Sequence, residues 1–111
     1  LPGFDQREVA LIGQVVRYHR KGMPAFGGFD KLMRPGDLEI LDRCALLLRL
    51  AEDLERSRDQ LVREVRVERE DGRVRLALHA RGDARVARWA ASRETELFRR
   101  AFGCELSVEA A

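Results

Sequence analysis

Histidine, cysteine and long apolar stretches are scarce in this sequence, and each scarcity excludes a class of function. Two histidines among 111 residues leave no basis for a histidine-rich metal site. The two cysteines, Cys44 and Cys104, lie in apolar stretches without the short spacing of metal ligands. We therefore predict that both are reduced core residues of a cytoplasmic protein.

Nothing in the sequence indicates export or insertion into a membrane. No apolar run approaches the roughly 20 residues that a membrane-spanning helix needs, and no signal peptide is recognisable. The sequence begins with Leu1 and not with methionine, from which we expect a segment of a longer protein. We predict no membrane partner.

The net charge is small, +2 at pH 7, and it is spread evenly along the chain. Residues 1–58 hold ten Lys/Arg against nine Asp/Glu, and residues 59–111 hold eleven against ten. A nucleic-acid-binding domain usually has a basic patch or a clear basic excess, so we predict no nucleic acid partner. Apolar residues at 45% and charged residues at 36% are typical of a globular domain.

The first half of the sequence has helical periodicity. Asp5 and Glu8 are spaced as a capping box that begins a helix, and Gly22 with Pro24 ends it. One face of this helix carries Val9, Ile12, Val15, Val16 and His19.

A second helix follows a glycine-rich loop over residues 22–36. Asp37 is expected to cap this helix, which runs to about Arg58. Its apolar residues cover well over a third of its circumference, and such a helix has neighbours on more than one side.

The pattern then changes from a period of 3.6 to a period of 2. Asp71-Gly72 is a strong two-residue hairpin turn between two alternating strands. This turn sets a register that pairs Glu70 with Arg73, Glu68 with Arg75, Val67 with Leu76, and Val65 with Leu78. Opposite charges then meet on one face and apolar residues on the other, which fixes the register.

A third helix, over about residues 84–102, is expected to bury Trp89 and Phe98 and to end at Gly103. A short strand after Gly103 completes a ββαβ unit. The predicted fold class is therefore α+β, with two long helices and a structured loop followed by a small ββαβ sheet-plus-helix unit. We predict two parts, a helical segment over residues 1–58 and a small C-terminal domain over residues 59–111.

The most unusual local cluster consists of Arg17, His19, Arg20 and Lys21, at a helix end beside a glycine turn. One interpretation is an anion site, most naturally for phosphate, because arginine offers a two-pronged donor and lysine a point charge. The other is that these cations offset the negative C-terminus of the helix, with His19 as a core histidine.

Two further charged groups have a functional and a structural interpretation. The end of the second helix carries Arg49, Glu52, Asp53, Glu55, Arg56, Arg58 and Asp59. Its carboxylates could act as acid and base or bind a metal, but a salt-bridged, solvated helix surface is the simpler interpretation. The hairpin arginines Arg66, Arg73 and Arg75 could form a basic face, although their cross-strand glutamates favour structural pairing.

Three stretches of the sequence, taken in order, resemble the Ppx/GppA phosphatase family. The first comprises LPGF, EVALI and RYHRKG, between residues 1 and 24. The second is LLLRLAEDLERS at residues 46–57. The third consists of Trp89, Phe98, Phe102 and Gly103.

The resemblance implies a division of labour within a larger protein. In this family an N-terminal pair of actin-like domains performs hydrolysis with a glutamate base, phosphate loops and magnesium. A helical HD-like domain and a small α/β domain follow, and this chain is similar to the later part of the HD-like domain plus the α/β tail. The chain departs from the family pattern at three places. It has Glu52 and Glu55 where aspartate is usual, and Arg58 where histidine is common. Residues 27–29 read GGF where the family often has a histidine.

We therefore expect the non-catalytic C-terminal region of an exopolyphosphatase or pppGpp phosphatase, with polyphosphate or pppGpp as the partner of the whole protein. The resemblance also implies a homodimer, inactivity of this chain alone, and magnesium only in the catalytic domains. It favours the anion interpretation of Arg17, His19, Arg20 and Lys21. Two alternatives stay open: an HD-type phosphohydrolase with a metal on Glu52 and Asp53, and a purely structural dimerisation tail.

Overall fold

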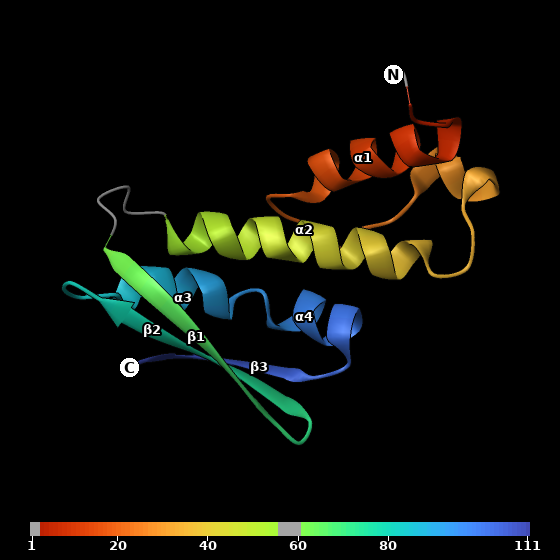
Figure 1. The fold of residues 1–111 in the computed structure, drawn as a ribbon. Coiled ribbons are helices and arrows are strands. Elements are labelled where there is room, and N and C mark those ends of the chain that lie inside the picture. The colour runs from red at the N-terminus through yellow and green to blue at the C-terminus, as the bar shows by residue number, and fades with distance from the viewer. Residues whose placement is uncertain (1–2, 56–60) are drawn as a thin grey trace.

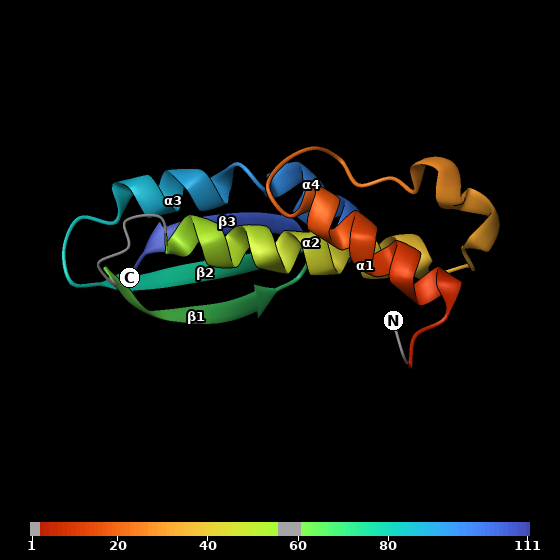
Figure 2. The same ribbon diagram turned by 90° about the horizontal axis from the view of Figure 1, so that it is seen from above.

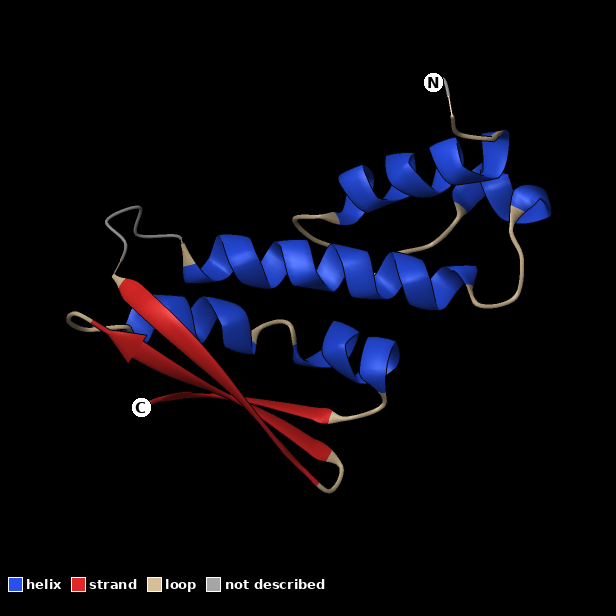
Figure 3. Ribbon diagram, viewed as in Figure 1, coloured by secondary structure: helices blue, strands red, loops and turns tan. Residues whose placement is uncertain are grey.

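The computed structural model of the protein describes residues 3–55 and 61–111. Figure 3 shows helices first, then a hairpin, then two short helices and a last strand. The elements are α1 Gln6–Tyr18, the 3-10 helix η1 Gly27–Leu32, α2 Asp37–Leu54, β1 Val62–Glu70, β2 Arg73–Ala80, α3 Arg85–Ser92, α4 Thr95–Phe102 and β3 Glu105–Ala110. The predicted α+β class is confirmed.

The three strands form one sheet, and the helices lie over one of its faces. Helices α3 and α4 pack on β3, α2 packs on α3 and α4, and α1 packs on α2 away from the sheet (Figure 1). The view from above shows α2 running beside α3 and α4 along the length of the sheet (Figure 2). Within residues 3–55 and 61–111, no helix has both the length and the apolar character needed to cross a bilayer.

The hairpin register is as predicted. Strands β1 and β2 are antiparallel, and Glu70 lies opposite Arg73 and Val67 opposite Leu76. The outer face of the sheet carries the charged pairs, with Arg75 bonded to Glu68. The alternation of apolar and charged residues therefore does fix which face of the hairpin is buried.

Strand β3 adds to β2 in the parallel direction, so that β2 is central. Two parallel strands need a long crossover between them, usually a helix, and α3 with α4 forms it. This crossover consists of two helices and not of the single helix predicted for residues 84–102. The helix breaks at Arg93 and Glu94, whose amides donate to the carbonyls three residues back, Ala90 and Ala91. Thr95 Oγ1 also donates to the Ser92 carbonyl, a bond typical of residues that favour turns.

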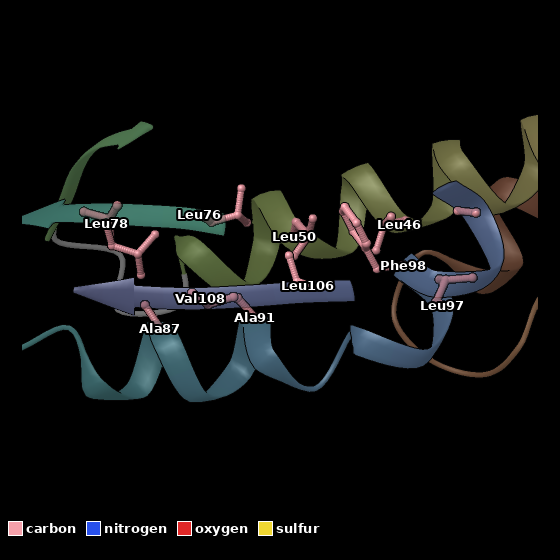
Figure 4. Packing of buried hydrophobic residues seen from close by; sticks show 12 residues of the cluster. Leu46, Leu50, Leu76, Leu78, Ala87, Ala91, Leu97, Phe98, Leu106 and Val108 are labelled. Atoms are coloured by element: carbon pink, nitrogen blue, oxygen red, sulfur yellow. The ribbon is translucent and has the colours of Figure 1, made fainter. Parts of the chain in front are cut away.

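One core joins elements from both halves of the chain. Leu46 and Leu50 of α2 point at the sheet and at α4, and the labelled side chains of β2, α3 and β3 meet them (Figure 4). The buried cluster is Leu46, Leu50, Val62, Leu76, Leu78, Ala87, Ala91, Leu97, Phe98, Ala101, Leu106 and Val108. The predicted burial of Phe98 is confirmed, whereas Trp89 is 61% exposed and is not a core residue.

Helix α1 is anchored on α2 through polar side chains. Arg7 of α1 donates to both oxygens of Asp37 of α2, at 2.8 and 2.6 Å.

The ends of both helices can be compared with the prediction. The predicted capping box of α1 is present, since the Asp5 carboxylate accepts from the Glu8 amide at 2.8 Å. Asp37 does not cap α2 as predicted: the cap position is Gly36, with a φ of 92°, and the Asp37 side chain accepts instead from the Arg34 amide. A positive φ there suits glycine, because it has no Cβ.

Acid should remove the contribution of Asp37 to stability. Its hydrogen bonds with the Arg7 side chain and the Arg34 amide lower the pKa of Asp37 from 3.8 to about 2. A carboxyl group with a lowered pKa stabilises the folded state above its unfolded pKa, and this stabilisation is lost as the pH falls toward the folded pKa. In urea unfolding at several pH values, the stability difference between the native chain and Asp37→Asn should be constant above about pH 5 and shrink between about pH 4 and pH 2. A difference that does not change with pH would contradict this assignment.

The apolar face predicted for α1 points outward. Val9, Ile12 and Val16 are 38%, 43% and 60% exposed. The buried residues of α1 are Ala10, Leu11 and Gln14, and the Gln14 side chain donates to the Ala25 carbonyl at 2.7 Å. Periodicity showed which residues share a face, but the small residues and the polar anchors determine which face is docked.

Helix α2 also leaves an apolar face uncovered, which we call the α2 stripe. The stripe is Ile40, Cys44, Leu47, Leu48 and Ala51, all of them exposed. Cys44 is therefore not a core residue, contrary to prediction; both cysteines are free thiols. Beside Leu47 lies a hollow of about 480 Å³ whose apolar lining includes Val67, Leu76 and Phe102.

Candidate anion-binding site

The predicted cluster lies on an exposed turn at the end of α1. Arg17, His19, Arg20 and Lys21 will be called the basic turn. Helix α1 ends at Tyr18, so these residues occupy its last turn and the segment that follows. Arg17, Arg20 and Lys21 are exposed, whereas His19 is half-buried and its Nδ1 bonds to the Val16 carbonyl. Gly22 continues the turn with a φ of 88°, a conformation that other residues adopt at a cost.

Among the described residues, the cations of the basic turn lack the ion-pair partners that several other arginines have. Many other arginines bond a carboxylate: Arg7 with Asp37, Arg43 with Glu39, Arg75 with Glu68 and Glu109, Arg85 with Asp83, Arg99 with Glu105, and Arg100 with Asp42. Among the described residues, no carboxylate lies within ion-pair distance of Arg17, Arg20 or Lys21. The basic turn thus presents three cations within five residues to solvent.

A buried arginine of α2 holds this turn from behind. The Arg49 side chain is only 11% exposed. Its Nη1 donates to the Gly22 carbonyl at 2.7 Å and lies 3.5 Å from the Tyr18 carbonyl. Its Nε donates to Glu94 Oε1 at 2.9 Å, and its Nη2 lies 2.9 Å from the same oxygen as an ion pair. One guanidinium therefore connects the basic turn to the break between α3 and α4.

Glu94 and Asp53 complete a buried charged group around Arg49. The Glu94 side chain is 7% exposed, and Asp53 is also buried. Burial and the neighbouring Asp53 carboxyl raise the pKa of Glu94, and Arg49 acts in the opposite direction. The prediction of a solvated helix surface is therefore wrong for Arg49 and Asp53, whereas Glu52 and Glu55 are exposed. Arg58 and the other residues of that run from 56 to 59 lie outside the described residues.

The sequence did contain a signal for Arg49 that charge counting overlooked. Arg49 is the one charged residue in the otherwise apolar run CALLLRLA of α2, and a charge in such a position is usually paired. Glu94 gave no comparable signal, because its burial depends on the break between α3 and α4.

The hairpin arginines are part of the sheet's own pairing. Arg75 bonds both Glu68 and Glu109, as the structural interpretation predicted. Arg66 pairs instead with Glu64 of its own strand, at 3.5 Å. Neither arrangement builds an open basic face.

The carboxylates proposed for a metal do not converge. Glu52 is exposed, whereas Asp53, the next residue of the helix, is buried beside Glu94. Within the described part of the chain, no three His, Cys, Asp or Glu side chains are grouped as metal ligands. The geometry offers no support for a metal on Glu52 and Asp53.

Comparison with known protein families identifies the family of this chain. The sequence profile of the Ppx/GppA phosphatase family, domain III, matches residues 1–95. The matched range contains the basic turn, Arg49 and Glu94. No curated protein sequence matches the chain. Because the profile covers most of the chain, the chain belongs to the Ppx/GppA phosphatase family and contains its domain III.

Proposed function

We propose that this chain is the non-catalytic C-terminal region of a cytoplasmic exopolyphosphatase or pppGpp phosphatase, and that its basic turn contacts long polyphosphate. The observation that carries the proposal is the group of three exposed cations without a carboxylate partner among the described residues. Phosphate oxygens are the natural ligands of such a group. Hydrolysis, with magnesium, would take place elsewhere in the whole protein, and the proposal assigns no residue of this chain to it.

Binding at this position must come from side-chain charge. A helix C-terminus carries a partial negative charge, so the end of α1 repels anions. Exposed cations bind anions weakly and are screened beyond about 8 Å at physiological salt. Short phosphates should therefore bind poorly, whereas a long chain that touches the basic turn of two subunits gains from linkage.

The same proposal includes a homodimer, for which the α2 stripe is the candidate contact. The stripe contains no charged residue, and its Leu47 helps to line the hollow beside it, whose lining is mostly apolar and also includes Arg43 and Arg69. A contiguous exposed apolar face is typical of a surface that associates. A second copy could place its own stripe against this hollow, with the same residues in contact on both sides, as two-fold symmetry requires.

Arg20→Ala combined with Lys21→Ala should weaken the binding of long polyphosphate about tenfold at low salt, because two charge contacts are lost. The slope of log affinity against log salt should become shallower, by up to about 2, since fewer counterions are released. The melting temperature should hardly change, because the two side chains are exposed. Fluorescence anisotropy of a labelled long chain at four salt concentrations measures both quantities.

The matched control is Lys31→Ala combined with Arg63→Ala, which removes the same charge from two exposed positions on η1 and β1. The control should keep most of the affinity. Equal losses in the two variants would mean that only net charge matters. Unfolding of the Arg20 and Lys21 variant, with unchanged binding per folded molecule, would show that the basic turn is structural.

A further inference from the structure

Arg49 is the one buried arginine whose hydrogen bonds reach the backbone of the basic turn among the described residues. It contacts the carbonyls of Tyr18 and Gly22, which bracket His19, Arg20 and Lys21. Its position on α2 is fixed by helix geometry, and its side chain is only 11% exposed. Arg49 therefore offers little surface to a long anion in solvent, while its two contacts hold the carbonyls on either side of the turn.

Glu94 holds Arg49 from the opposite side. The Glu94 carbonyl accepts from the Phe98 amide at 2.9 Å, which ties its backbone to the first turn of α4. Its carboxylate accepts from Arg49 Nε and forms an ion pair with Arg49 Nη2. The position of the basic turn is thus connected, through one side chain, to the break between α3 and α4.

We propose that Arg49, held by Glu94, is a positioning residue for the basic turn, and that it couples anion binding there to the geometry of the α3–α4 break. The proposal rests on the proposed polyphosphate contact and names the residue that regulates it. It follows from the contacts of Arg49 with the Tyr18 and Gly22 carbonyls, from its bond to the Glu94 carboxylate, and from the low exposure of the Arg49 and Glu94 side chains.

The physical basis is preorganisation. Among the described residues, Arg20 and Lys21 have no carboxylate within ion-pair distance that could order them. Glycine has a wide range of backbone conformations, so Gly22 by itself would not fix the turn without the bond to Arg49. An anchored turn presents its cations without the ordering cost that a flexible turn incurs on binding. A lysine at position 49 would keep the charge, but its single ammonium group lacks the planar fork that reaches Gly22 and Glu94 at the same time.

Arg49→Lys and Glu94→Gln should each weaken the binding of long polyphosphate by about 3- to 10-fold, since part of the ordering cost returns. The slope of log affinity against log salt should stay unchanged, because all exposed cations are still present. The ¹⁵N order parameters of residues 19–22 should fall from about 0.85 to below about 0.6 in the free chain. Arg7→Lys is the matched control: it disturbs another ion pair with a buried carboxylate, Asp37, and should change none of these values.

Three results would overturn the proposal. One is an unchanged order parameter for residues 19–22 in folded Arg49→Lys and Glu94→Gln. Another is a loss of affinity per folded molecule no larger than that of Arg7→Lys. The third is a shallower salt slope in Arg49→Lys, which would mean that Arg49 itself contacts phosphate.

The experiments distinguish a failure of the proposed polyphosphate contact from a failure of the proposed role of Arg49. If the native chain and the Arg20 and Lys21 double variant bind polyphosphate equally, the proposed function fails. The order parameters still report on Arg49 in that case, because they need no ligand. If Arg49→Lys does not fold, Glu94→Gln decides, since it keeps Arg49 and changes only the charge of its partner.

Discussion

Leu46→Ala should lower the free energy of unfolding by about 2–5 kcal/mol, the usual range for removal of a fully buried leucine. Leu46 is completely buried on α2 and belongs to the cluster that includes Leu97 and Phe98 of α4. Removing its side chain leaves a cavity at the point where α2 meets the last part of the chain. The loss should therefore affect both halves, because they share this core.

Leu38→Ala is the matched control on the same helix, outside the α2 stripe. Leu38 is 39% exposed, so its truncation should cost less than about 1 kcal/mol. Urea unfolding followed by far-UV circular dichroism and by Trp89 fluorescence measures both variants. Coincident transitions are expected, and equal losses for the two leucines or two separate transitions would contradict the shared core.

Leu47→Glu should weaken self-association of the chain about 100-fold or more. Leu47 is 58% exposed at the centre of the α2 stripe, where the proposed dimer would enclose it. A carboxylate enclosed at an apolar contact without a partner costs several kcal/mol, and each 1.4 kcal/mol changes the dissociation constant tenfold. The monomer should remain folded, because the side chain is exposed there.

Val86→Glu is the control for this substitution. Val86 is 61% exposed on α3 and does not belong to the α2 stripe, so the same charge there should leave association unchanged. Sedimentation equilibrium from low to high micromolar concentration measures the dissociation constants. A native chain that stays monomeric at high micromolar concentration would refute the dimer, and an equal effect of both substitutions would place the contact elsewhere.

The hairpin could be predicted in detail because its sequence carries two independent signals. The alternation of apolar and charged residues selects the buried face, and Asp71-Gly72 sets the loop. The capping box at Asp5 is a similar case, since its partner Glu8 is only three residues away. Local patterns of this kind need no knowledge of the rest of the fold.

Predictions that depended on tertiary packing were less successful. Trp89 and Cys44 have apolar side chains at helical spacing, but the helices around them leave both exposed. The outward face of α1 has the same cause, because periodicity gives a shared face and not its direction. The bond between Glu94 and Arg49 of α2 joins residues that are distant in sequence, so no local pattern predicts it.

The candidate site was found from composition and not from geometry. The basic turn is recognisable in the sequence as four basic residues within the five positions 17–21, and three of the four are exposed. The buried contacts of Arg49 that hold it could not be predicted, because they join residues 27 and 45 positions apart. Its role in binding stays a proposal.

The most direct test of the central claim is to map long polyphosphate on the ¹⁵N-labelled native chain by chemical-shift perturbation at low salt. The account predicts shifts concentrated at residues 17–22, smaller shifts around Arg49 and Glu94, and their disappearance as salt is raised above the range in which exposed charges bind. Perturbation of the hairpin arginines instead, or no perturbation at low salt, would contradict the assignment of the basic turn as the polyphosphate contact.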